Sequence, residues 1–218
     1  MPDSQLVLLL AGASVAGYLL GSINSAIVLS RLMFKDDIRR HGSGNAGMTN
    51  MLRIYGKKAA ALTAAGDFLK AAAAIALSRM ALSYLGAELP LDIGYIAGFF
   101  ALLGHLFPVY FRFKGGKGIM STLGIIFCVN PLAFLIIAVT FVPLVLLVRI
   151  VSLMSVLGAI IYPFLTWAVL AFQNKPVLYD TLCSCVFAVI VLIMHRENIK
   201  RLIKGTEPRF SRKRKSQE

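Results

Sequence analysis

The first segment with residues able to do chemistry is glycine-rich and covers positions 41 to 53, reading HGSGNAGMTNMLR. Its three glycines permit tight backbone turns. Between and after them stand hydroxyl, amide and guanidinium groups, from Ser43, Asn45, Thr49, Asn50 and Arg53. Such a set of donors, acceptors and one cation can bind a polar ligand. Taken alone, the pattern is also typical of an ordinary turn that caps a short helix.

A second glycine-rich segment carries two cations, Lys114 and Lys117, around a turn built from Gly115, Gly116 and Gly118. A turn of this kind at the start of a helix exposes backbone N–H groups and the positive end of the helix dipole. With two ammonium groups added, these are the parts of an anion site. The GxxxxGK[ST] spacing of a Walker A loop is absent.

Two further polar clusters lie at the ends of apolar runs. Arg149, Ser152 and Ser155 occupy a short turn between two such runs, where a positively charged anchor with a helix N-cap is the alternative interpretation. His195 and Asn198 stand three residues apart at the end of the last run, so they share one face of a helix. A single histidine at such a place is more often a helix cap than a reactant.

Considered together, the four clusters predict one basic, donor-rich pocket. A small phosphorylated molecule is the ligand that such a pocket suits, because cations and N–H donors bind phosphate strongly. The sequence contains no carboxylate or Cys/His cluster with metal-ligand spacing, and no GxSxG motif. We therefore expect neither a metal nor an organic cofactor.

The composition shows what kind of scaffold must position these residues. The chain of 218 residues is 58% hydrophobic and 15% charged, with a mean hydropathy of +0.76. In a soluble domain about a quarter of the residues are charged, so this composition excludes both a soluble enzyme and a disordered chain. The net charge of +13 then indicates basic loops beside a membrane rather than nucleic-acid binding. The three cysteines lie inside apolar stretches and predict no disulfide framework.

Apolar runs predict an all-α polytopic membrane protein with seven transmembrane helices. They form one domain over residues 1–210, followed by a basic polar tail at 211–218. The first run, from Leu6 to Ser30, lacks the basic start of a signal peptide and is expected to be a retained helix. The remaining runs cover 59–82, 91–108, 118–129, 132–148, 153–172 and 177–194.

The number of spans depends on whether residues 118–148 form one helix or two helices broken at Asn130-Pro131. With seven spans and the N-terminus outside, 20 of the 23 Lys and Arg residues fall on the cytoplasmic side. Six spans would place the nine basic residues of the C-terminal segment outside, against the positive-inside tendency. Seven spans are therefore preferred, with the C-terminus and all four polar clusters on the cytoplasmic side.

Two ionisable residues lie deep inside the second apolar run. Asp67 and Lys70 are three positions apart, so they share a helix face. Charges at that depth are costly and are usually paired or functional. We expect these two to form a structural ion pair.

The polar clusters belong to five ordered motifs that resemble the bacterial acyl-phosphate:glycerol-3-phosphate acyltransferase family (PlsY). The resemblance covers about Val15 to Phe210 and rests on GSINSA at 21–26, SGNAGMTNMLR at 43–53, GHLFPVYFRFKGGKGIMSTLG at 104–124, RIVSLMS at 149–155 and HRENIKRLIKGTE at 195–207. It departs from the family at Ile119-Met120, where smaller or different residues are usual, and this touches no polar group.

The resemblance implies a multi-pass enzyme of the bacterial inner membrane whose site faces the cytoplasm. Such an enzyme moves a fatty acyl group from acyl phosphate to the sn-1 hydroxyl of glycerol 3-phosphate. The products are lysophosphatidic acid and phosphate, in the first step of phospholipid synthesis. The implied partners are these two substrates and the lipid bilayer, with no nucleic acid, and with possible coupling to the enzyme that makes acyl phosphate.

The resemblance also implies roles for individual residues. Ser43 and Arg53 match a serine and an arginine needed for activity, and His195 with Asn198 matches the essential pair of the last motif. The turn from Gly115 to Gly118, with Lys117, matches the glycerol-phosphate-binding loop, and either Ser152 or Ser155 matches a serine near the phosphate. Glu197 corresponds to a glutamate held to be structural, while His41 and His105 receive no role.

Two other functions remain as alternatives from the sequence. A transporter for a small phosphorylated solute would need a polar path through the bilayer, commonly with repeated halves, and no internal repeat is visible. An acyltransferase that uses acyl-CoA would be expected to carry an HxxxxD motif. No aspartate follows any of the three histidines at that spacing.

Overall fold

The computed structural model describes residues 3–209, and this part of the chain consists of helices and loops with no strand. In order, the helices are α1 (Asp3–Gly21), α2 (Ser25–Phe34), η1 (Ile38–Arg40), α3 (Met48–Tyr84), α4 (Ile93–Leu106), η2 (Val109–Phe111), α5 (Ile119–Val129), α6 (Pro131–Val148), α7 (Val151–Phe172), α8 (Leu178–Met194) and α9 (Arg196–Ile203). The predicted all-helical class is confirmed. The basic tail predicted at 211–218 lies outside the described residues.

Several of these helices have the length and hydropathy needed to cross a membrane. Within the described residues, five segments meet both criteria, and the number rises to six if α8 and α9, bent by 65° relative to each other, count as one span. Helix α5 has 11 residues, about 16 Å at 1.5 Å per residue, so it is shorter than the hydrocarbon core of a bilayer.

The first apolar run is not one helix, as the sequence predicted, but two. Helix α1 ends at Gly21, where an added Cβ would lie 2.0 Å from the Ala101 carbonyl oxygen of α4. The side chain of Asn24 then caps α2 by accepting a hydrogen bond from Ile27 N at 3.1 Å. Close helix packing and a polar cap therefore divide an apolar run that hydropathy alone predicts to be one continuous helix.

The predicted break at Asn130-Pro131 is confirmed. Helix α5 ends at Val129, and the Asn130 side chain accepts a hydrogen bond from Ala133 N at 3.0 Å. Pro131 occupies the first position of α6, where its missing N–H group costs nothing. The two short helices thus pack as separate elements.

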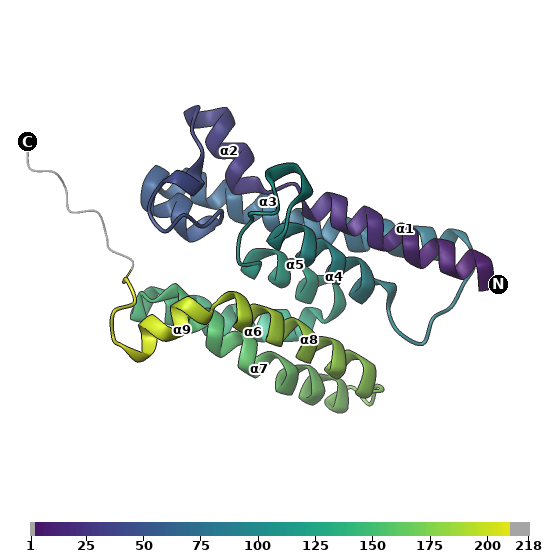
Figure 1. Cartoon of the computed structure of the whole chain (residues 1–218). Helices are drawn as coiled ribbons and strands as arrows, with labels where there is room; N and C mark the ends of the chain where they lie inside the picture. The colour runs from purple at the N-terminus through teal and green to yellow at the C-terminus, as the bar shows by residue number, and fades with distance from the viewer. Residues whose placement is uncertain (1–2, 210–218) are drawn as a thin grey trace, which may run out of the picture.

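The polar segments gather at one end of the helices. In Figure 1, α1 to α5 form one group and α6 to α9 a second, and the amino end of α1 points away from the end that carries α2, the start of α3 and α9. The loop between α2 and α3 and the loop between α4 and α5 both lie at this latter end. The fold therefore brings together clusters that are up to about 150 residues apart in the sequence.

A buried charge cluster ties the first group of helices together. Lys70 Nζ lies 2.9 Å from Asp67 Oδ1 and 2.9 Å from His105 Nδ1, and all three side chains are almost fully buried. Lys70 also donates to the Ile23 carbonyl at 2.9 Å, and Asp67 accepts from Ser25 N at 3.3 Å. The expected pair of Asp67 and Lys70 is therefore in place, and it also satisfies backbone groups at the break between α1 and α2.

The ion pair predicts a distinctive stability pattern. Asp67→Asn leaves the Lys70 ammonium buried without a carboxylate, which typically costs about 3–5 kcal/mol. Asp67→Asn/Lys70→Met removes both charges, so we expect a higher folded yield and a higher melting temperature than for the single variant. Size-exclusion yield and thermal unfolding of the purified proteins in detergent measure this. A double variant as unstable as Asp67→Asn would contradict the pairing argument.

Candidate active site

The polar end of the helices contains a carboxylate that the sequence analysis did not single out. Glu207 follows α9, and its side chain is only 7% exposed. It accepts hydrogen bonds from Ser152 Oγ at 2.6 Å, Asn198 Nδ2 at 2.6 Å and Arg201 Nε at 2.7 Å. Burial raises the pKa of this carboxyl, but the three donors outweigh burial and hold the pKa below its ordinary value. Glu207 is thus an ionised centre that joins the start of α7 to α9.

Lys117 connects this centre to the glycine-rich turn between α4 and α5. Its ammonium donates to Asn198 Oδ1, so the Asn198 amide stands between Lys117 and Glu207. Partial burial lowers the pKa of Lys117, and the nearby Arg201 charge lowers it further, while Glu207 acts in the opposite direction. The residue is the cation best placed to receive an anion here.

His195 lies at the junction of α8 and α9 and is 3% exposed. Its Nδ1 lies 2.8 Å from the Val191 carbonyl oxygen, which requires a proton on Nδ1. Burial lowers the pKa of His195, which favours the neutral ring. Among the described residues, Nε2 has no hydrogen-bond partner, so this nitrogen can still accept a hydrogen bond. The geometry suits a ring that orients a hydroxyl group.

The two candidate serines of α7 differ in their contacts. Ser152 Oγ belongs to the Glu207 network, whereas Ser155 Oγ donates to the Val151 carbonyl of its own helix at 3.0 Å. Of the two, Ser152 is the one brought to the polar cluster.

Two of the backbone donors that the sequence predicted in the glycine-rich turn are paired within the protein. The N–H groups of Gly115 and Gly116 donate to the carbonyls of Leu106 and His105, each at 3.2 Å. An added Cβ at Gly116 would lie 2.3 Å from His105 Nε2 and 2.6 Å from the Ala46 carbonyl oxygen. These two glycines therefore allow close packing. Their own N–H groups are not available to a phosphate, but the N–H groups of Gly118, Ile119 and Met120 at the start of α5 have no backbone hydrogen bond among the described residues.

The loop between α2 and α3 presents Ser43 and Arg53 on an internally bonded frame. Asn50 is buried; its Oδ1 accepts from Ser43 N at 3.1 Å, and its Nδ2 donates to the carbonyls of His41 at 2.9 Å and Ile38 at 3.3 Å. Asn50 therefore shapes the loop. The Ser43 and Arg53 side chains are exposed, and Asn45 and Thr49 are partly buried.

The structure thus brings some predicted site residues together and leaves others apart. Lys117, Ser152 and Asn198 share one network with Glu207, with His195 beside it. Within the described residues, Ser43, Arg53 and the exposed Lys114 make no side-chain hydrogen bond to that network. A substrate that contacts both sets would have to bridge the loop after α2 and the start of α9.

Glu197, which the resemblance implied to be structural, has an exposed side chain. Its ion pairs join it to Lys200 at 3.0 Å and Arg196 at 3.9 Å, both in its own helix. Exposed pairs of this kind add little stability. The buried carboxylate of this region is Glu207, and its signal in the sequence is a single acid within the otherwise basic segment 198–209.

The helices and the site define a class of protein: an all-helical membrane protein with a basic, hydrogen-bonding site at one end of its bundle. A family model described as glycerol-3-phosphate acyltransferase matches residues 11–205. The glycerol-3-phosphate acyltransferase of Agrobacterium fabrum is 40% identical over 94% of each chain. That of Macrococcus caseolyticus is 39% identical over 96% of this chain and all of its own.

A solved structure supports the same assignment. The crystal structure of PlsY (YgiH), an integral membrane glycerol 3-phosphate acyltransferase, in its glycerol 3-phosphate form aligns with a TM-score of 0.79 at 34% identity, covering 93% of this chain and 96% of that one. Its lysophosphatidic acid form aligns with a TM-score of 0.76 at 33% identity, covering 93% and 95%. The chain belongs to the glycerol-3-phosphate acyltransferase family, as the sequence motifs indicated.

The Glu207 network predicts a stability difference between two glutamates. Glu207→Gln removes the charge that receives three donors, and we expect the melting temperature to fall by about 5 °C, from the loss of charge-assisted hydrogen bonds. Glu197→Gln, the matched control beside α9, should change it by less than about 1 °C. Thermal unfolding of both proteins at pH 7 measures this, and equal shifts would argue against Glu207 as the centre of the network.

Proposed function

We propose that this protein transfers a fatty acyl group from acyl phosphate to the sn-1 hydroxyl of glycerol 3-phosphate, giving lysophosphatidic acid and phosphate. One observation carries the proposal: Asn198 and Ser152 donate to Glu207, and Lys117 donates to Asn198, beside a histidine whose Nε2 remains available. Family membership indicates that glycerol 3-phosphate is the acyl acceptor. The solved relative was crystallised in forms named for glycerol 3-phosphate and lysophosphatidic acid.

The chemistry asks the protein to position charges more than to create a strong nucleophile. Acyl phosphate is a mixed anhydride with a good leaving group. The sn-1 oxygen attacks the acyl carbon, the bond between that carbon and the phosphate oxygen breaks, and phosphate leaves with the electron pair. A phosphate oxygen of the substrate accepts the hydroxyl proton, so the reaction balances without a protein base. What remains for the site is orientation and neutralisation of two anions.

The chain's own residues fit these tasks. Lys117 and Arg53 would neutralise the phosphate groups, with Lys114 close to the same turn. Ser43 would donate a hydrogen bond, and Ser152, whose hydroxyl proton goes to Glu207, would accept one. Nε2 of His195 would orient the attacking hydroxyl. Asn198, fixed by Glu207, would hold Lys117 in place. Asn50 would act indirectly, through the loop that it shapes.

For the membrane arrangement we propose seven spans, with the N-terminus outside and the site on the cytoplasmic side of the inner membrane. Helix α5 is short, but it packs between α3, α4 and α6 rather than alone in lipid. Ser121 and Thr122 of α5 are buried, and Ser121 Oγ donates to the Asp67 carbonyl at 3.2 Å. A helix enclosed by protein need not match the bilayer thickness, because its neighbours satisfy its ends.

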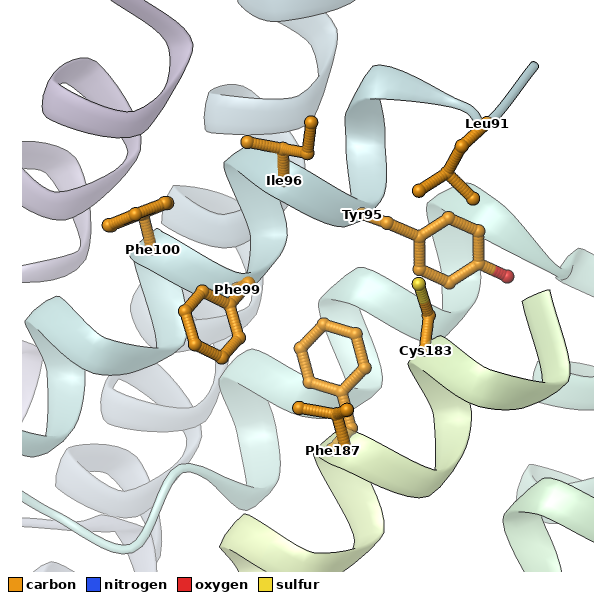
Figure 2. Close-up of a pocket in the computed structure, with 8 residues that line it drawn as sticks. Leu91, Tyr95, Ile96, Phe99, Phe100, Cys183 and Phe187 are labelled. Atoms are coloured by element: carbon orange, nitrogen blue, oxygen red, sulfur yellow. The ribbon is translucent and has the colours of Figure 1, made fainter. Parts of the chain in front are cut away.

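The acyl chain has a candidate place in an apolar groove between α4 and α8. The groove has a volume of about 190 Å³ and is lined by Tyr95, Phe99, Cys183, Val186 and Phe187 among others (Figure 2). Phe187 stands eight residues before His195, about 12 Å away along α8. A long acyl chain whose carbonyl lies at His195 would reach this groove, and a short one would not.

The acyl donor is tested directly with purified protein. Given glycerol 3-phosphate and either palmitoyl phosphate, palmitoyl-CoA or palmitoyl acyl carrier protein, we expect lysophosphatidic acid only from palmitoyl phosphate. Because Lys117 and Arg53 would neutralise the phosphate groups, no metal should be required, and addition of EDTA should leave the rate unchanged. Product formed mainly from the thioesters would overturn the proposed donor.

The groove predicts chain-length selectivity. Val186→Phe adds bulk to the groove wall, so we expect kcat/KM for a 16-carbon acyl phosphate to fall by about tenfold while the value for an 8-carbon substrate stays nearly constant. Val189→Phe, an exposed position on the same helix outside the groove, is the matched control. A similar loss for both chain lengths would place the acyl chain elsewhere.

A further inference from the structure

A second cavity, distinct from the Glu207 network, lies between the end of α2 and the loop that contains η2. Its volume is about 370 Å³, within the range of small-molecule sites, about 300–1,000 Å³. Four arginines line it, Arg31, Arg39, Arg40 and Arg112, together with Asp37, Tyr110 and Phe111. None of these residues belongs to the network of Lys117, Asn198 and Glu207.

The charges around this cavity are unbalanced. Asp37 is its only lining carboxylate, and it pairs with Arg39 at 2.7 Å and with Arg31 at 3.0 Å. The Arg39 guanidinium lowers the pKa of Asp37 well below its usual range, so Asp37 is ionised. Among the described residues, Arg40 and Arg112 have no ion-pair or hydrogen-bond partner for their side chains. Four cations and one anion leave a local charge of +3 that calls for an anionic ligand.

Two of the arginines, Arg31 and Arg39, make further contacts at the cavity besides their ion pairs with Asp37. Arg39 Nη1 donates to the carbonyls of Phe111 at 2.8 Å and Lys114 at 3.3 Å, and the Arg31 guanidinium lies 5.4 Å from the centre of the Phe111 ring. Arg112 has a positive φ of 58°, which few non-glycine residues adopt. Arg31 and Arg39 therefore connect α2 and η1 to the loop that contains η2.

Exposed apolar side chains stand at or next to the lining residues in the sequence, and we refer to them as the rim of the cavity. Leu32, Met33 and Phe34 at the end of α2, Tyr110 in η2 and Phe113 after it all present exposed side chains. Helix α2 continues the first apolar run, and the two helices together extend over 31 residues, more than the roughly 20 needed to cross a bilayer. Cations at the end of such a run, with apolar and aromatic neighbours, are typical of the membrane–water interface.

We propose that this cavity binds the phosphate head group of an anionic membrane lipid. Guanidinium groups match phosphate oxygens in paired hydrogen bonds, and the apolar rim would contact the adjoining acyl chains. A lipid satisfies both the excess charge and the exposed rim, whereas free phosphate satisfies only the charge. Since Arg39 also contacts the Lys114 carbonyl, the bound head group would support the loop that leads to Lys117.

The test uses purified full-length protein in a neutral detergent, with bound molecules counted by native mass spectrometry. The probes are phosphatidylglycerol, phosphatidylcholine and inorganic phosphate. We expect phosphatidylglycerol to bind to the parent protein in preference to phosphatidylcholine. Arg40→Gln/Arg112→Gln should weaken its binding by about 30-fold, because each basic side chain near an anionic surface contributes to affinity. The control Lys57→Gln/Lys58→Gln removes two exposed charges outside the cavity and should retain binding.

Each other outcome overturns the proposal. Equal losses in the arginine and lysine variants would reveal a general surface effect, and inorganic phosphate binding as tightly as phosphatidylglycerol would mean that no lipid is recognised. Arg40→Lys/Arg112→Lys guards against a folding defect, because it keeps the charge and should regain part of the binding. Binding is measured without turnover, so the result is independent of the proposed acyl transfer.

Discussion

A charge buried between helices can be stabilised only by partners inside the protein. The rest of this structure depends on the contacts that Asp67 and Lys70 make. Their pair accepts and donates hydrogen bonds at Ser25 N and Ile23 O, the two sides of the break between α1 and α2. The pair also fixes His105, and the His105 ring leaves no space for a side chain at Gly116. Because the turn at Gly116 leads directly to Lys117, the buried pair sets the position of a candidate site residue well outside it.

The candidate site depends on a second constraint, the contact between the two groups of helices. Lys117 comes from the first group, and Ser152, Asn198 and Glu207 come from the second. The Lys117–Asn198 hydrogen bond is therefore both a feature of the site and a link between the two halves. An enzyme that joins a water-soluble acceptor to a lipid chain needs such a junction, because the polar head and the apolar chain must enter between the same helices.

The sequence predicted the elements better than it predicted their contacts. Hydropathy found the apolar runs, and Pro131 marked the break before α6, because both signals are local. The break at Gly21 was missed, since it arises from the approach of that glycine to the Ala101 carbonyl on another helix. Glu207 was missed for the same reason: a lone acid in a basic segment has no local pattern, and its three donors come from α7 and α9.

The glycine-rich turn shows why a motif can identify a site and still mislead about its parts. Gly115 and Gly116 suggested free N–H donors, yet their N–H groups pair with the end of α4, and their missing side chains are what matters. With these two donors occupied, we propose that the side chains of Lys117 on one side and Arg53 on the other neutralise the substrates. A flexible cation can follow a phosphate as it changes from part of the mixed anhydride to a leaving group, whereas a fixed backbone cradle would favour one state. Side-chain cations therefore suit a reaction in which the bond to phosphate breaks.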